Sequence, residues 1–275
     1  MKIKLIADVG INANGDIEIA KKLIQVCRLA GVDVVKFQKR NPDKCVPEHQ
    51  KNVMRETPWG DMTYLEYNHR IEFGQKEYEE IDDMCRSIGI EWTASAWDID
   101  SLHFLNRFTV PFVKIPSALI TDKTLLRECA ELNMPVILST GMCTMDMVDE
   151  AMKIDYLRVN GLLHCVSTYP SKPEEQNMLC IQTLKKRYPG VPVGFSNHHP
   201  GLTFLTVAPA FGAEILEFHI TLDRAMWGTD QAASIEPEGV FHLVKRIQGI
   251  ELATGDGNKR IMDSEMPIMK KLRCI

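Results

Sequence analysis

Two lysines lie inside apolar stretches of this 275-residue chain, where a charged side chain is unfavourable unless it meets an anion. Lys36 and Lys114 each have apolar neighbours on both sides. Each alone would fit a lysine that reaches solvent or pairs with a carboxylate. Ser117 and Ser139 stand close to the ends of similar runs. Together with these hydroxyls, the two lysines favour a bound phosphate or carboxylate.

Two histidines stand at the ends of the last two apolar runs. His198 and His219 are 21 residues apart. Two neutral imidazoles, completed by a carboxylate, water or a substrate oxygen, suit a divalent transition metal. His199 duplicates the first position, so spacing alone does not choose between the two neighbours. His164 lies within an apolar run and fits a hydrogen-bonded core histidine.

The elements that position these residues form a regular alternation of short apolar runs and amphipathic segments. Strands are predicted at 5–9, 32–38, 90–94, 112–115, 136–139, 162–166, 193–196 and 215–220. Helices are predicted near 17–30, 75–88, 101–107, 122–133, 145–153, 175–188, 202–211 and 238–253. Eight strand–helix units without a composition break predict an α/β fold, a single (β/α)8 TIM barrel. A doubly wound open sheet is the competing architecture.

One connection is far longer than the rest. Residues 39–73 contain Pro42, Pro47, Pro58 and Gly60 and follow the second predicted strand. Connections in α/β units usually span two to six residues. In a barrel this segment would lie over the C-terminal mouth, either as a lid or substrate loop or as a surface excursion without function.

Composition limits the possible partners. Hydrophobic residues make up 45% of the chain and charged residues 25%, as in ordinary globular domains. A formal net charge of −5 argues against nucleic-acid binding through bulk charge. No apolar stretch reaches about 18 residues, so no membrane partner is expected. Eight scattered cysteines without a Cys-x-x-Cys pair, and no signal peptide, predict free thiols and a cytoplasmic location.

Nine motifs carry a resemblance to a known family. They are 6–15 (IADVGINANG), 35–38 (VKFQ), 114–117 (KIPS), 138–142 (LSTGM), 164–170 (HCVSTYP), 194–198 (GFSNH), 218–223 (FHITLD), 227–230 (WGTD) and 233–237 (ASIEP). In this order and spacing the chain resembles the sialic acid synthase family. That family condenses phosphoenolpyruvate with N-acetylmannosamine or a related aldose. The resemblance runs from about residue 4 to about residue 272.

The resemblance implies roles for particular residues. A divalent metal, usually manganese, with magnesium or cobalt as alternatives, would be held by His198 and His219. Phosphoenolpyruvate contacts would fall on Lys36, Thr93, Lys114, Ser117, Ser139 and Ser196, with Ser167 where relatives often have asparagine. Further active-site positions fall on Asp8, Gln38, Tyr169, Glu217 and Asp230. Asp230 would lie near the acceptor sugar, and Asp230 and Glu217 would either bind sugar hydroxyls or transfer protons.

The chain also departs from the family pattern. Asp8 replaces a usual glutamate, Asn197 a usual aspartate, and Gln231 a usual histidine. Bacterial relatives commonly continue into an antifreeze-like domain that reaches the partner's active site. Residues 1–275 are expected to form a single catalytic barrel without that domain. The segment 39–73 would then close the acceptor pocket.

Three hypotheses about function follow. The first is an active synthase that makes a nonulosonic acid and phosphate by C–O cleavage, and the resemblance implies a homodimer. The second, motivated by the departures, is a barrel that binds sugar without turnover. The third keeps the reaction and changes the aldose, for example to a phosphorylated one. Lys39, Arg40 and Arg70 are cations that would serve such an acceptor, and each also fits an ordinary solvated charge.

Overall fold

Eight parallel strands close into a barrel in the computed structural model, which describes residues 2–273. The strands are β1 (Lys4–Gly10), β2 (Val34–Lys39), β5 (Glu91–Ala96), β6 (Val113–Ile115), β7 (Val136–Ser139), β8 (Val159–Cys165), β9 (Val193–Asn197) and β10 (Ile215–His219). The barrel closes where β1 pairs with β10 on one side and β2 on the other. The predicted (β/α)8 barrel is therefore confirmed, and the open-sheet alternative is wrong.

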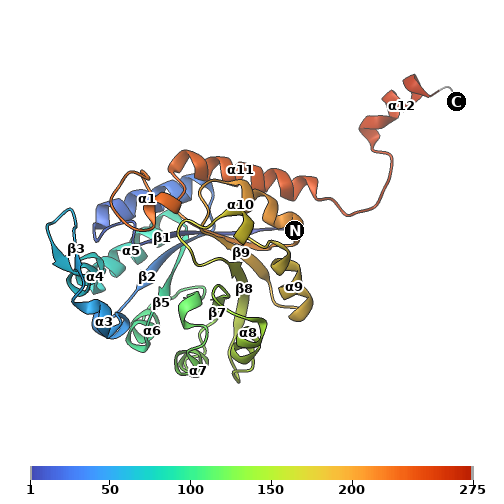
Figure 1. Ribbon diagram of the computed structural model, residues 1–275. Coiled ribbons are helices and arrows are strands. Elements are labelled where there is room, and N and C mark those ends of the chain that lie inside the picture. The colour runs from blue at the N-terminus through green and yellow to red at the C-terminus, as the bar shows by residue number, and fades with distance from the viewer. Residues whose placement is uncertain (1, 274–275) are drawn as a thin grey trace.

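Helices surround the barrel, with at least one between each pair of successive barrel strands and α11 after the last (Figure 1). They are α1 (Ile17–Ala30), α5 (Gln75–Ile88), α6 (Ile99–Leu105), α7 (Lys123–Glu131), α8 (Met145–Met152), α9 (Leu179–Arg187), α10 (Thr203–Val207) and α11 (Pro237–Ala253). Helix α1 shows the local rules: Asp16 caps its first turn, and Gly31 ends it in the left-handed conformation. The predicted helix at 202–211 divides into α10 and a 3₁₀ turn, η3 (Ala208–Phe211), which contains Pro209.

The barrel interior changes from apolar to polar along the strand direction. A small apolar cluster fills its lower part and consists of Ile6, Val34, Phe112, Ile137, Leu163 and Ile215. Two residues further along the same six strands stand Asp8, Lys36, Lys114, Ser139, Cys165 and Glu217. Because side chains two apart on a strand share one face, the polar set lies directly above the apolar set. The apolar cluster is thus the floor of a polar pocket at the C-terminal end of the barrel.

The long segment after β2 has structure of its own. It contains α2 (Pro42–Cys45), α3 (Glu48–Lys51), a hairpin of β3 (Met54–Arg55) and β4 (Met62–Thr63), and α4 (Tyr64–Ile71). Its aromatic rings pack against Trp227 of the β10–α11 connection: Tyr67 at 5.2 Å and Trp59 at 5.9 Å between ring centroids. The segment therefore packs against a second connection from the C-terminal side of the barrel.

Beyond α11 the chain leaves the barrel. Figure 1 shows residues after Ala253 extending away from the body to α12 (Met266–Leu272). No helix within residues 2–273 is long and apolar enough to cross a membrane.

Candidate active site

A cavity of about 170 Å³ opens above the apolar floor. The predicted site residues that line it are Asp8, Lys36, Gln38, Lys114, Ser117, Ser139, Ser167, Tyr169, Ser196, His198, Glu217 and His219. They come from seven strands or the turns that follow them, so the barrel brings together positions spread over more than 200 residues of sequence. Thr93 and Asp230 are the two predicted residues that do not line this cavity.

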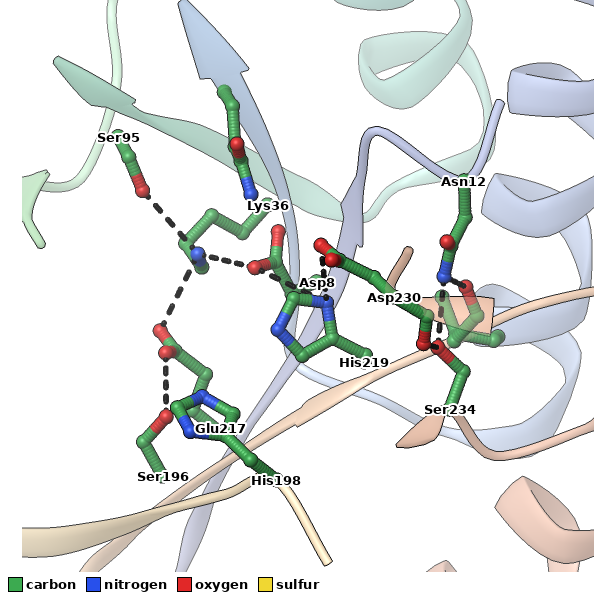
Figure 2. Close-up of polar contacts among 12 residues, drawn as sticks. Asp8, Asn12, Lys36, Ser95, Ser196, His198, Glu217, His219, Asp230 and Ser234 are labelled. Carbon is green, nitrogen blue, oxygen red and sulfur yellow. Dashed lines mark hydrogen bonds and ion pairs between the residues drawn. The ribbon is translucent and has the colours of Figure 1, made fainter. Parts of the chain in front are cut away.

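The centre of the cavity is a network of two lysines and two carboxylates. Figure 2 shows Lys36, Asp8 and Glu217 of this network. Lys36 Nζ donates to Asp8 Oδ2 at 2.6 Å and to Ser95 Oγ at 3.2 Å. Glu217 stands between the two ammonium groups, 3.8 Å from Lys36 Nζ and 3.9 Å from Lys114 Nζ. Ser196 donates to Glu217 Oε1 at 2.9 Å.

The two lysines differ in electrostatic environment although both are almost fully buried, at 3% and 2% exposure. Burial lowers the pKa of Lys36, but Asp8 and Glu217 outweigh it, and the pKa lies above its ordinary value. For Lys114, burial and the positive charge of Lys36 lower the pKa by more than the Glu217 carboxylate raises it, so the pKa lies below its ordinary value. Burial alone would raise the pKa of Glu217, yet Lys114 and Lys36 bring it down to about 2. Lys114 is therefore the cation whose charge is less fully compensated, and an incoming anion would stabilise it.

Hydroxyl groups and a glycine surround Lys114. Its Nζ donates to the Ser139 hydroxyl and to the Ile115 carbonyl oxygen. Nearby, the Gly141 N–H donates to Ser117 Oγ at 3.0 Å. Small hydroxyl side chains and a glycine leave space in which oxygen atoms of a phosphate or carboxylate can approach the lysine.

Gly141 provides a direct test of this space. A Cβ at residue 141 would lie 2.2 Å from Ser167 Oγ and 2.8 Å from Ser117 Oγ, within van der Waals overlap. We expect Gly141→Ala to raise KM for the anionic substrate at least about tenfold, since a displaced hydroxyl weakens a charge-assisted contact. Steady-state phosphate release measures this effect. Gly249→Ala is the matched control, because a Cβ there meets no atom within 4 Å; equal effects of both changes would contradict the prediction.

His198 is held in one tautomer. Its Nδ1 lies 2.6 Å from the carbonyl oxygen of Val166, which can only accept, so Nδ1 carries the proton. The Nε2 lone pair accepts from the Tyr169 hydroxyl at 2.9 Å. Burial and the neighbouring His219 lower the pKa of His198 to about 3, so the ring is neutral at pH 7. A neutral imidazole whose Nε2 carries no proton is the form that ligates metals, and a metal at this Nε2 would replace the Tyr169 hydrogen bond.

His219 completes the pair. Its ring centroid lies 5.6 Å from that of His198. Its Nδ1 is buried without a hydrogen-bond partner, 3.6 Å from Asp8 Oδ2 and 3.8 Å from Asp230 Oδ2. Within residues 2–273 no three His, Cys, Asp or Glu side chains are arranged as a complete metal site. The unprotonated Nε2 of His198 and the unpartnered Nδ1 of His219 make the two imidazoles candidate metal ligands, to which water and substrate oxygens would be added.

The other two histidines near these strands have different surroundings. His199 packs edge-on against Phe204 at 4.8 Å and does not line the cavity. His164 Nε2 lies 2.7 Å from the carbonyl oxygen of Gln176, in agreement with a core histidine. Of these two neighbours, His198 is the one whose side chain lines the cavity.

Asp230 lies beside His219 at the edge of the cavity, on the connection after β10. Its backbone carbonyl accepts from Ser234 Oγ at 2.6 Å, and Ser234 accepts from Asn12 Nδ2 at 2.8 Å (Figure 2). Asn12 also donates to the Ile220 carbonyl oxygen at 2.9 Å. These contacts between the β1 and β10 connections fix where the Asp230 carboxylate stands. Asn12 and Ser234 were not predicted as site residues.

Strand β5 places its polar residues at two levels. Thr93 is fully buried, and its hydroxyl donates to the Phe112 carbonyl oxygen. Ser95 and Trp97, two and four residues further on, line the cavity instead. Two residues along a strand span about 6.6 Å, so Thr93 stands one level below the pocket. Strand alternation at 93, 95 and 97 is the sequence signal that could have identified Ser95 and Trp97.

Asn197 and Gln231, the departures from the family pattern other than Asp8, also have hydrogen-bond partners. The Asn197 side chain donates to the His199 carbonyl oxygen at 2.7 Å and accepts from the His199 N–H at 3.3 Å. The Gln231 amide donates to the Asn12 carbonyl oxygen at 3.2 Å and accepts from Thr221. Both amides are nearly fully buried and stabilise the connections that carry His198 and Asp230.

The sequence of this chain is similar to those of known proteins. A NeuB family model matches residues 23–259, most of the chain. The chain belongs to the NeuB family. It is 35% identical to N-acetylneuraminate-9-phosphate synthase of Mus musculus, with 98% of this chain and 76% of the mouse protein covered. It is also 35% identical to N,N'-diacetyllegionaminic acid synthase of Legionella pneumophila, over 98% of this chain and 78% of that protein.

A solved NeuB-type structure shares the fold. The crystal structure of N-acetylneuraminic acid synthetase from Leptospira borgpetersenii, in complex with citrate, superimposes with a TM-score of 0.87 at 30% identity. The match covers 98% of this chain and 91% of that one. As a NeuB-family protein, the chain is an enzyme, a phosphoenolpyruvate-dependent nonulosonic acid synthase. NeuB synthases generally use a divalent metal.

Proposed function

We propose that this NeuB-family enzyme condenses phosphoenolpyruvate with an N-acetylmannosamine-type aldose to give a sialic-type acid and phosphate. The observation that carries the proposal is the one cavity in which Lys36, Lys114 and Glu217 meet the imidazoles of His198 and His219. A receptacle for a small dianion and a two-histidine metal site in one pocket are the two parts that this condensation needs.

Phosphoenolpyruvate would be held by Lys114 and Lys36 with the hydroxyls of Ser117, Ser139 and Ser196. Lys114 carries the less compensated charge, so its ammonium would make the stronger new contact with the phosphate or carboxylate. Lys36 is fixed by Asp8 and Ser95 and needs little reordering to meet the same anion. Preorganised donors of this kind stabilise negative charge without rearrangement during the reaction.

The balance of charges favours an added cation. The carboxylates of Asp8 and Glu217 already face the two ammonium groups, and the Asp230 carboxylate lies 3.8 Å from His219 Nδ1. Phosphoenolpyruvate brings a carboxylate and a phosphate into the same space. A divalent ion at His198 and His219, manganese in our proposal, would offset this excess and polarise the aldehyde oxygen of the open-chain sugar when bound.

The bond changes balance with one water molecule. C3 of phosphoenolpyruvate attacks the aldehyde carbon, water adds at C2, and the C2–O bond to phosphate breaks. Asp230, at the edge of the cavity, would bind the acceptor hydroxyls. Glu217 would stay ionised and hold both lysines toward the anion, given its pKa of about 2. Holding both substrates in one orientation would supply much of the rate.

The non-catalytic alternative has less support. Asn197 and Gln231 are accommodated by internal hydrogen bonds, and Asp8 pairs with Lys36. The remaining parts of the proposal are that the chain has a single catalytic domain, the barrel, that it forms a homodimer, and that it acts in the cytoplasm. Seven cysteines of residues 2–273 are free thiols, which fits a reducing compartment.

The test is phosphate release from phosphoenolpyruvate with a panel of aldoses and manganese, with products identified by mass spectrometry. We expect release only when an aldose is present, and loss of release with a chelator. Phosphoenolpyruvate labelled with ¹⁸O at the bridging oxygen should deliver the label to phosphate. Release without any aldose, or label retained in the sugar acid, would overturn the proposal.

A further inference from the structure

Arg40 is a cation beside the active site that the proposed reaction does not yet use. It lies just beyond β2, two residues after Gln38, which lines the active-site cavity. Its guanidinium stacks over the Trp97 ring at 4.7 Å and donates to the side-chain oxygens of Gln38 and, at 3.3 Å, Asn68. Its Nε is buried without a partner. All side-chain partners of this guanidinium are neutral.

Other cations of the same segment are already engaged or point elsewhere. Lys39 pairs with Glu72 at 2.6 Å, and Lys44 pairs with Asp100 at 2.7 Å. Arg70 is exposed and stacks over Trp59 at 4.5 Å. For Arg40, no carboxylate of residues 2–273 lies within ion-pair distance of the guanidinium. The Arg40 guanidinium is therefore held in place by neutral side chains and forms no ion pair with any of residues 2–273, while the Arg40 backbone N–H donates to the Glu72 carboxylate at 2.9 Å.

A second cavity, which Arg40 lines, lies beside the active-site cavity. It measures about 580 Å³, is lined by Arg40, Lys44, Tyr64 and Asn68 among others, and shares Trp97 and Ala118 with the first cavity. A ligand that extends from the first cavity past Trp97 would enter the second beside Arg40.

The two carboxylates of the second cavity serve the backbone. Asp98 accepts from the N–H groups of Asn41 and Ser101. Asp122 accepts from the N–H groups of Thr124 and Leu125 at the start of α7. Because these carboxylates are used in caps, the guanidinium remains the available charged donor for an anion in this cavity.

We propose that Arg40 binds an anionic group, a phosphate or carboxylate, at the end of the acceptor remote from its aldehyde. This rests on the proposed function, since it assigns the acceptor of that same site. An arginine held over an aromatic ring can present N–H groups that match the two oxygens of a phosphate or carboxylate. Arg40 is thus a specificity-determining residue that favours anionic aldoses over neutral ones.

The experiment compares N-acetylmannosamine, its 6-phosphate and its uronic acid as acceptors with phosphoenolpyruvate. The wild-type enzyme should have a kcat/KM for one of the two anionic sugars about 10- to 100-fold above that for the neutral one. Arg40→Met should remove this preference by raising KM for the anionic sugar. Arg40→Lys should retain part of the preference. The preferred anionic sugar identifies the group as phosphate or carboxylate.

Arg70→Met is the matched control, because it also removes an arginine stacked on a tryptophan of the same segment. It should leave the preference unchanged. The inference is overturned if wild-type enzyme uses the neutral sugar at least as well, or if Arg40→Met lowers kcat/KM equally for all three. Absence of product with every aldose would instead reject the proposed function.

Discussion

Replacing Lys114 with methionine is expected to lower kcat/KM for phosphate release by about 10²- to 10³-fold while leaving the fold intact or more stable. The side chain is 2% exposed, and its nearest carboxylate oxygen, on Glu217, is 3.9 Å away. Methionine keeps the apolar stem and removes a buried charge whose pKa is lowered by burial and by Lys36. Loss of a preorganised donor to a substrate anion produces a rate effect of this size.

The lowered pKa gives this prediction a second readout. A lysine whose pKa is lower when folded destabilises the protein at neutral pH, and that penalty fades as pH rises through the lowered value toward 10.5. The wild-type melting temperature should therefore contain a component that rises with pH in this range, and Lys114→Met should lack it. Thermal unfolding across pH, with phosphate-release kinetics, measures both effects. A variant that loses both activity and stability would contradict the assignment of Lys114 as an anion-binding rather than structural residue.

Replacing His219 with alanine is expected to weaken divalent-metal binding more than about 100-fold and to abolish phosphate release. Its ring lies 5.6 Å from that of His198, and its Nδ1 has no hydrogen-bond partner. Changes in residues that only support a metal ligand already weaken binding by about 10- to 100-fold, so removal of a ligand should exceed that. Calorimetric titration with manganese measures the effect independently of turnover.

His199→Ala is the control for this experiment. His199 is adjacent to His198 in sequence, but its ring packs on Phe204 outside the cavity. The His199→Ala variant should bind manganese with the same affinity as the wild type. Equal loss in both variants would mean that the metal is not held by the residue 198 and 219 pair.

The eight strands could be predicted from sequence because apolar runs and helix ends are local signals. The lysines at 36 and 114 were recognisable since charge inside an apolar run is unfavourable without a partner. Their actual partners were not predictable. Asp8 and Lys36 stand opposite each other only because β1 and β2 pair in a particular register. Register between strands 28 residues apart depends on the closed barrel as a whole.

The segment 39–73 shows the same limit more strongly. Its length indicated a loop over the mouth, yet its hairpin and its contacts with Trp227 depend on non-local packing. Arg40 was one of three candidate cations in sequence. Only the side-chain geometry shows that Lys39 forms an ion pair with Glu72 and that Arg70 faces solvent, while the Arg40 guanidinium lies over Trp97 without an ion pair to residues 2–273.

The layered interior of the barrel has a practical consequence for changing this enzyme. The apolar residues of the floor and the polar residues of the cavity lie on the same strands, with each polar residue two positions after an apolar one. The residues that stabilise the barrel and the residues that line the active-site cavity therefore lie at two different levels along the same strands. In our proposal the remote end of the acceptor lies further out still, beside Arg40 and Trp97. A redesign for a new acceptor sugar can therefore change residues around Arg40 and Trp97 and leave the two lysines, their hydroxyl neighbours and the apolar floor unchanged.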